Sequence, residues 1–357
     1  FGDDAYSKVR NKLRLDTAKL HVLDDHVGLH PSMRAAKDLF DDGRLAIVQG
    51  VGYPNPNRSH FRSMKIWQTA QFDEAAHDGY GWLGRALDLE MPHGNQATGA
   101  GAMFLGEQEM PVALWGRRSS AIALSRTEDL VLQSDVASVQ SKCDTVHRDT
   151  ELEQFVTKQF MTARAASDDF KRQESEDMST GDVAYPNTAL GSRLELLSKI
   201  LKSDSRARVF YTIQGGYDTH SSQLYTHSRL LREFSDAVKA FLDDLRTAKL
   251  DDRVLLLAFS EFGRRVKEND SQGTDHGTAG PVFLAGTSVI PGLHGQTPDL
   301  TDLVDGDLKM KMDFRGLYAS ILEDWLDVNS QNILGGDFEG PPLTTACYKS
   351  SLSIRHT

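Results

Sequence analysis

The chain has 357 residues, of which 39% are hydrophobic and 25% are charged. These fractions are those of an ordinary globular protein, which excludes wholesale disorder and a fibrous repeat. The formal net charge of −11 argues against nucleic acid as a partner, because neutralising phosphates needs clustered Lys and Arg. No run of about 18 apolar residues occurs, so the sequence predicts no membrane-spanning helix.

Neither the start of the sequence nor its cysteines define a compartment. The sequence begins at Phe1 without a charged and then apolar leader, which was therefore removed, left out or never present. Cys143 and Cys347 lie far apart and share no C-x-x-C spacing, which argues against a zinc ribbon or a redox dithiol. A single disulfide and two unrelated thiols both stay open.

The first predicted helix covers residues 31–42, with Pro31 at a suitable first position and Gly43 just past the end. The apolar run at 44–49 (RLAIVQ) follows directly and predicts a strand that is covered on both faces.

The segment after this strand predicts an extended turn, because Pro54 and Pro56 disfavour helical backbone before them. A helix then follows, and Ser59 and His60 lie near its N-terminus. A hydroxyl at such a position meets unpaired backbone N–H groups and a favourable dipole, which suits an anion site or an alkoxide nucleophile. A serine there is also commonly no more than the N-cap of the helix.

Residues 80–204 differ in composition from the rest of the chain: they contain Gly-rich and polar stretches and few apolar runs that predict strands. Within them we expect one long helix at 150–170 and a polar loop at 171–181. We interpret 80–204 as an insertion, or cap, in a core made of residues 1–79 and 205–357.

The second half of the chain predicts three more strands, at 207–213 (ARVFYTI), 253–259 (RVLLLAF) and 281–285 (PVFLA). Apolar residues at three- and four-residue steps across 224–245 predict a helix, giving a strand, helix, strand crossover. A last helix is expected at 313–327. The alternation favours an α/β fold with a mostly parallel sheet sandwiched by helices.

Polar loops adjoin each of these strands, where open α/β sheets bind their ligands. Asp218 and His220 in GGYDTHSSQ can reach one metal ion, or can belong to an ordinary turn. Glu261 in SEFGRR can be a metal ligand, a base, or a hydrogen-bond acceptor that orients a ligand. Arg264 or Arg265 can clamp an anion, and a surface ion pair is the alternative.

The fourth loop, GTDHGTAGP, holds Asp275 and His276 between glycines. Adjacent Asp and His in a Gly-rich loop beside a strand form the best single candidate ligand pair in the sequence.

Five segments carry a resemblance to a known family. In chain order they are AIVQGVGYPNPNRSHFRSMKIWQTA, GGYDTHSSQ, SEFGRRV, TDHGTAGPVFLAG and DFRGLYASILEDWL. Together they resemble the bacterial family called domain of unknown function 1501, over Gly2 to about Leu326. The resemblance implies the alkaline phosphatase superfamily, with sulfatases, phosphodiesterases and cofactor-independent phosphoglycerate mutases.

That superfamily has a nucleophilic Ser, Thr or modified Cys at the head of a helix, and Asp and His ligands at strand ends. The resemblance implies that Ser59 is the nucleophile and that Asp218 with His220 forms part of one ligand set. It also implies that Asp275 with His276 matches the later His-Gly loop.

The sequence departs from the superfamily pattern at three points. Only Thr219 separates Asp218 from His220, where three residues are usual, and Glu261 with Phe262 replaces a ligating Asp-His pair, so we expect an altered or absent second metal site. Family members also usually begin with a strand and a Gly-Gly-x-Asp-Gly loop, and this chain starts just after the point where they would lie. The resemblance therefore implies that a central strand and an Asp ligand are missing from the given sequence, having been cleaved, left out or supplied separately. A twin-arginine signal, common in the family, implies a periplasmic or extracellular location.

The leading hypothesis is an exported hydrolase of phosphate or sulfate esters with a divalent cation, zinc before manganese or calcium. Asp218, His220, Asp275 and His276 would hold the cation, and Ser59, His60, Glu261 and Arg264 would be catalytic. Its substrate would be a small anionic ester or a decorated glycan. The alternatives are a non-catalytic secreted binding or assembly protein, and an esterase that acts on carbohydrate decoration.

Overall fold

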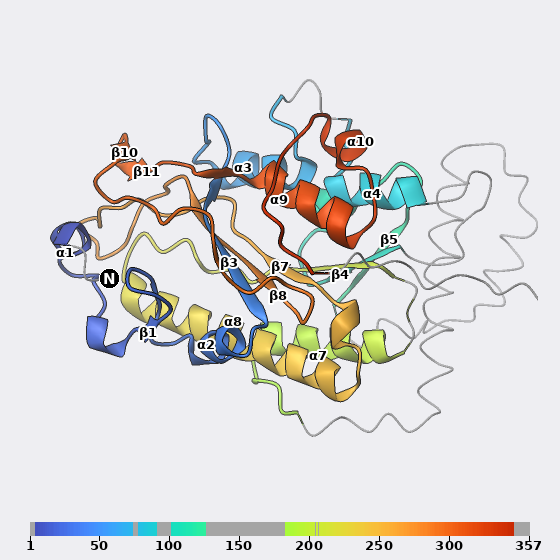
Figure 1. Cartoon of the computed structure of the whole chain (residues 1–357), viewed down its shortest axis with the longest axis horizontal. Coiled ribbons are helices and arrows are strands. Elements are labelled where there is room, and N and C mark those ends of the chain that lie inside the picture. The colour runs from blue at the N-terminus through green and yellow to red at the C-terminus, as the bar shows by residue number, and fades with distance from the viewer. Residues whose placement is uncertain are drawn as a thin grey trace, which may run out of the picture. The chain divides into compact units, whose positions relative to one another are not determined.

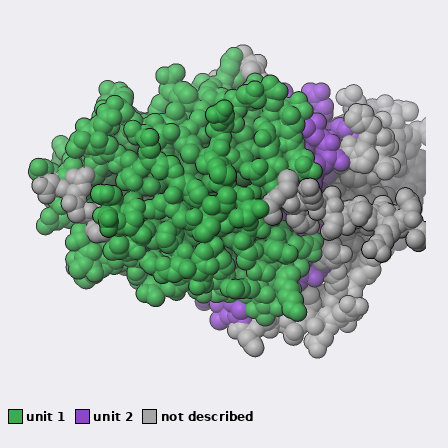
Figure 2. Space-filling view, viewed as in Figure 1, with its two compact units in different colours: residues 1–76, 214–357 green, residues 77–213 purple. Residues whose placement is uncertain are grey.

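The computed structural model describes residues 4–73, 78–90, 101–125, 183–203, 205 and 207–345. It divides into two compact units, which Figure 2 distinguishes by colour: unit 1 is Phe1–Ala76 with Gln214–Thr357, and unit 2 is His77–Ile213. Both contain helices and sheets, so the protein is mixed α/β. The helix expected at 150–170, the polar loop expected at 171–181 and both cysteines lie outside the described residues.

Unit 1 is built on a five-stranded sheet in the order β12-β3-β8-β7, with β9 also paired to β3. Its strands are β3 (Leu45–Gly52), β7 (Leu256–Ala258), β8 (Gly280–Ala285), β9 (Gly292–His294) and β12 (Met312–Asp313). Strand β3 is buried at every position, as its continuous apolar run predicts. Strands β9 and β12 run parallel to β3, whereas β8 runs antiparallel to both β3 and β7.

Strand β7 therefore runs in the same direction as β3, β9 and β12, so the sheet of unit 1 is mostly parallel, as expected, with β8 as its one reversed strand. A parallel connection needs a crossover, usually a helix. Residues 259–279 are all described and contain no helix, so the chain turns back after β7 and enters β8 in the opposite direction.

Helices cover both faces of this sheet. Figure 1 shows α2 (Arg34–Asp41) and α8 (Gln223–Thr247) on one side of β3, and α3 (His60–Thr69) and α9 (Phe314–Ser320) on the other. Helix α9 continues as a π-helical turn, Ile321–Trp325. None of the helices in the described part of the chain is long and apolar enough to cross a membrane.

Short elements complete unit 1. They are α1 (Asp4–Val9), the 3₁₀ turns Thr17–Lys19 and Asp251–Arg253, α10 (Ser330–Leu334), and two small hairpins, β1 (His21–Val22) with β2 (Gly28–Leu29) and β10 (Leu303–Val304) with β11 (Asp307–Leu308).

Unit 2 holds a separate, parallel sheet in the order β5-β4-β6, formed by β4 (Ala102–Leu105), β5 (Ala121–Leu124) and β6 (Val209–Thr212). It also contains α4 (Trp82–Glu90), the 3₁₀ turn Val112–Leu114 and α7 (Ala189–Lys202). Its core includes Leu87, Phe104 and Leu114. Because β6 and β7 belong to different sheets, the crossover expected between residues 207–213 and 253–259 is wrong.

Candidate metal centre

Loops of unit 1 meet at one end of its sheet. The register pairs Val51 near the end of β3 with Gly280 at the start of β8, so the loop before β8 lies beside the loop after β3. The loop after β7 joins them through an antiparallel bridge between Arg264 and His276. The stretch 214–222, which leads into α8, adds Asp218 and His220 through the contacts described next.

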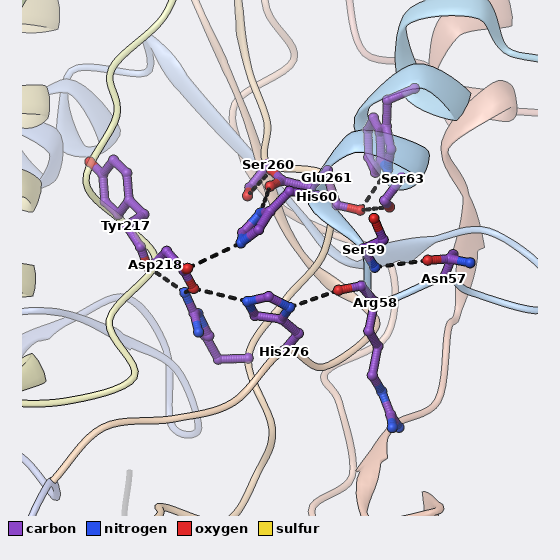
Figure 3. Close-up of polar contacts among 12 residues, drawn as sticks. Asn57, Arg58, Ser59, His60, Ser63, Tyr217, Asp218, Ser260, Glu261 and His276 are labelled. Carbon is purple, nitrogen blue, oxygen red and sulfur yellow. Dashed lines mark hydrogen bonds and ion pairs between the residues drawn. The ribbon is translucent and has the colours of Figure 1, made fainter. Parts of the chain in front are cut away.

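The carboxylate of Asp218 is the centre of the cluster (Figure 3). Its Oδ1 lies 2.9 Å from Nε2 of His276 and 2.7 Å from a terminal nitrogen of Arg264. The same oxygen lies 2.9 Å from Nε2 of His220, which the figure does not label. Its Oδ2 lies 3.3 Å from Nε2 of His60. Three imidazole rings thus converge on one carboxylate through the same ring nitrogen.

The other ring nitrogen of each histidine is held by an oxygen. The Nδ1 partners are Glu261 Oε1 at 2.6 Å for His60, the Arg58 carbonyl at 2.7 Å for His276, and Asp275 Oδ1 at 3.0 Å for His220. Carboxylate and carbonyl oxygens only accept, so these contacts place a proton on each Nδ1. A ring that binds a cation would then do so through the lone pair of Nε2. This is how proteins orient histidines that ligate a metal.

The cluster fits a cation. With the Nδ1 protons in place, the contacts of Nε2 with Asp218 need a positive charge, which is either a second proton on the ring or a cation between the atoms. The Nε2 atom of His60 is buried and has no hydrogen-bond partner among the described residues. One ligand atom each from His60, Asp218 and His276 lies within 4.8 Å of the others. Two imidazoles and a carboxylate suit zinc or manganese better than calcium, which takes oxygen ligands.

Two of the carboxyl groups stay ionised. Burial opposes ionisation of Asp218, but hydrogen bonds from His276 and Arg264, with the charges of Arg264 and His220, outweigh it and hold its pKa well below the usual range. Hydrogen bonds from His220 and then Asn269 lower the pKa of Asp275. The two carboxylates outnumber the one guanidinium that binds Asp218, so the cluster can balance a cation that replaces the protons on Nε2.

Two glycines allow the loops to approach so closely. A Cβ atom at Gly273 would lie 2.1 Å from the carbonyl carbon of His220, and one at Gly277 would lie 2.6 Å from that of Arg264. Side chains at these two positions would push apart the segments that carry the histidines.

Arg264 cross-links two loops. Its guanidinium donates to the carbonyls of Tyr217 and Thr274, each at 2.7 Å, as well as to Asp218. These bonds fix the carboxylate of Asp218 between the histidines. The predicted role of Arg264 as an anion clamp stays a prediction.

Ser59 immediately precedes α3, but its side chain makes no capping hydrogen bond. Its backbone N–H donates to Oδ1 of Asn57 at 2.8 Å, and the residue is exposed. Ser59 occupies the N-cap position of α3, although its hydroxyl does not cap the helix, so the alternative that it is only the N-cap stays open. Its role as a nucleophile stays a prediction.

The structure brings together all four predicted ligands, Asp218, His220, Asp275 and His276, although Asp275 contacts the cluster through His220. In addition, His60, which was predicted to be catalytic, lies where it can ligate the same cation.

Two residues of the centre were not predicted from the sequence. Asn269 donates to the His220 carbonyl at 2.9 Å and to Asp275 at 3.2 Å, while its own oxygen accepts from the backbone of Gly273. The sequence feature that could have identified Asn269 is the turn-forming composition of residues 269–273, NDSQG. Asp307 pairs with Arg58 and Arg265, and no sequence signal marked it.

The family model described as "Protein of unknown function (DUF1501)" matches residues 15–326. The chain belongs to this family. The predicted family is thereby confirmed, and the match spans every residue of the candidate metal centre of this DUF1501 protein. No similar curated protein and no similar solved structure was found.

Proposed function

We propose that this DUF1501 protein is a metal-dependent hydrolase of phosphate or sulfate esters, related to alkaline phosphatases and sulfatases. The observation that carries the proposal is the convergence of His60, Asp218 and His276, each histidine with its Nδ1 proton already bound to an oxygen. The resemblance stated above supports the superfamily and an exported, periplasmic or extracellular protein.

A bound divalent ion would supply Lewis acidity and lower the pKa of a hydroxyl or water beside it. Ser59, at the head of α3, would attack the phosphorus or sulfur atom, and the ester bond to the leaving alcohol would break. The positive end of the α3 helix dipole would stabilise the transferred anionic group. Water would then release the group from Ser59 and restore its hydroxyl.

The accessibility of the cluster supports a substrate that approaches from solvent. The side chains of Asp218 and His60 are 48% and 38% exposed. Such an open centre is compatible with a small anionic ester and with a decorated glycan whose remainder stays outside.

The first experiment is elemental analysis of protein purified without chelators. We expect bound zinc or manganese, and we expect His276→Ala to lose it. His294→Ala is the matched control, because in the described structure the His294 ring bonds only the carbonyl of Ile290 at 2.7 Å. Protein that carries no cation and takes up none from added zinc or manganese contradicts the proposal.

The second experiment screens 4-nitrophenyl phosphate, 4-nitrophenyl sulfate and 4-nitrophenyl acetate with the cation-loaded protein. We expect turnover of the phosphate or the sulfate, and we expect Ser59→Ala to abolish it while cation binding persists. Turnover of the acetate alone would instead identify an esterase.

A non-catalytic binding protein is the second candidate. It is favoured by the engagement of Arg264 with two backbone carbonyls and Asp218, which leaves that guanidinium less able to hold a substrate anion. A protein that binds a cation and one of these anions tightly, yet hydrolyses no ester in the screen, would favour this candidate.

A further inference from the structure

Glu261 accepts four hydrogen bonds on three of its oxygen atoms. Its backbone carbonyl accepts hydrogen bonds from Ser63 Oγ at 2.8 Å and from Trp67 Nε1 at 2.9 Å. Its carboxylate accepts from Ser260 Oγ on Oε2 at 2.9 Å and from His60 Nδ1 on Oε1 at 2.6 Å. With 14% of its side chain exposed, Glu261 is fixed in position relative to α3.

The scaffold behind Glu261 is rigid. Trp67 is 1% exposed and stacks against Phe259 and Phe314, with ring centroids 4.9 and 4.4 Å away. A closely packed aromatic cluster of this kind resists rearrangement. The carbonyl of Glu261 is therefore anchored by a donor that is itself immobile.

The next residue, Phe262, packs against two of the candidate ligands. Its ring centroid lies 5.0 Å from that of His60 and 4.6 Å from that of His276. The phenylalanine has no atom with which to bind a cation, but it limits rotation of both imidazoles. The pair Glu261 and Phe262 thus supports His60 and His276 from behind.

We propose that Glu261 is a positioning residue for His60 and that the centre holds a single divalent cation. Both carboxylate oxygens of Glu261 are already engaged, one of them by the nitrogen of His60 that faces away from Asp218. A carboxylate in this place holds the Nδ1 proton, presents Nε2 to the cation and makes the imidazole a stronger donor. The inference rests on the cation site of the proposed function, but not on hydrolysis.

The test is calorimetric titration of the metal-free full chain with zinc and, separately, with manganese. We expect one equivalent in the unchanged protein, and the same stoichiometry with affinity lower by roughly 10- to 100-fold in Glu261→Gln. The matched control is Glu195→Gln on α7, where Glu195 pairs with Lys199 at 2.7 Å. We expect this variant to bind with unchanged affinity.

A second readout separates positioning from general support of the fold. Nitrogen-15 spectra of the histidine side chains, recorded on metal-free protein at alkaline pH, report which ring nitrogen of His60 carries the proton. We expect Nδ1 in the unchanged protein and a mixture of both forms in Glu261→Ala. Near-ultraviolet circular dichroism checks that each variant is folded, and the isosteric glutamine variant serves if alanine is not tolerated.

The possible results are distinguishable. Two equivalents in the unchanged protein and one in Glu261→Gln would make Glu261 a ligand and overturn the proposal. Equal affinities in the two proteins would also overturn it. A protein that binds no cation overturns both this inference and the proposed function, whereas a protein that binds one cation but hydrolyses no ester contradicts only the hydrolase.

Discussion

Replacing Asp307 by asparagine tests whether the β10–β11 hairpin supports the candidate metal centre. The Asp307 side chain is 1% exposed, binds the guanidinium of Arg58, and lies 3.1 Å from Nε of Arg265. The carbonyl of Arg58 accepts the Nδ1 proton of His276. Asparagine keeps the shape of the side chain but removes the charge that holds both arginines.

The expected cost follows from burial. Removing one partner of a fully buried ion pair costs about 3–5 kcal/mol, because a charge is left without a partner. The side chains of Arg58 and Arg265 are 44% and 33% exposed, so water compensates part of that loss. We therefore expect the free energy of unfolding of unit 1 to fall by roughly 2 kcal/mol.

Urea unfolding is the assay, with amide hydrogen exchange to assign each transition to a unit. With a slope near 2 kcal/mol per molar urea, the midpoint of unit 1 should fall by roughly 1 M. Asp302→Asn is the control in the same hairpin, because Asp302 is 49% exposed and pairs only at the surface with Lys309. We expect that variant to change stability by less than about 0.5 kcal/mol. Equal midpoints for Asp307→Asn and the unchanged protein would refute the reasoning.

Two further predictions concern other parts of the molecule. Burial, followed by the charges of His30, Arg264 and Arg10, lowers the pKa of His227 from 6.5 to about 4. The unfolded state therefore binds this proton more tightly, and the free energy of unfolding should fall by up to roughly 3 kcal/mol as the pH drops from 6.5 to 4. In urea unfolding measured at several pH values, the free energy of unfolding of His227→Gln should lack this fall between pH 6.5 and pH 4. In unit 2, Phe104 is 0% exposed, so Phe104→Ala should cost about 3–5 kcal/mol in urea unfolding. Leu89→Ala, at a side chain 53% exposed, should cost far less.

The elements that the sequence predicts well are those with a strong, long pattern. The run at 44–49 became β3, and the apolar steps across 224–245 became α8. The strand expected at 253–259 is shorter, Leu256–Ala258, because a 3₁₀ turn occupies Asp251–Arg253. Periodicity gives the type of an element, but it carries little information on which sheet a strand joins or in which direction it runs.

In the candidate metal centre, the sequence predicted the residues that lie in a local pattern and missed those whose role depends on distant contacts. Asp218, His220, Asp275 and His276 stand out because polar residues adjoin glycines and strands. His60 was noticed only as the neighbour of Ser59, since its ligand geometry depends on Glu261, 201 positions away in sequence. Contacts across such separations leave no spacing pattern in a single sequence, and the same holds for Asp307, which is 249 positions from Arg58.

The antiparallel direction of β8 explains why the loops meet at all. Residues 273–279 precede β8, so in a parallel sheet they would lie at the opposite edge from the loops after β3 and β7. Because β8 is reversed, its first residue pairs near the last residues of β3. The same reversal folds 259–280 back on itself and pairs Arg264 with His276. Movement of one of these two residues therefore displaces the other, which couples the orientation of His276 to the position of Asp218.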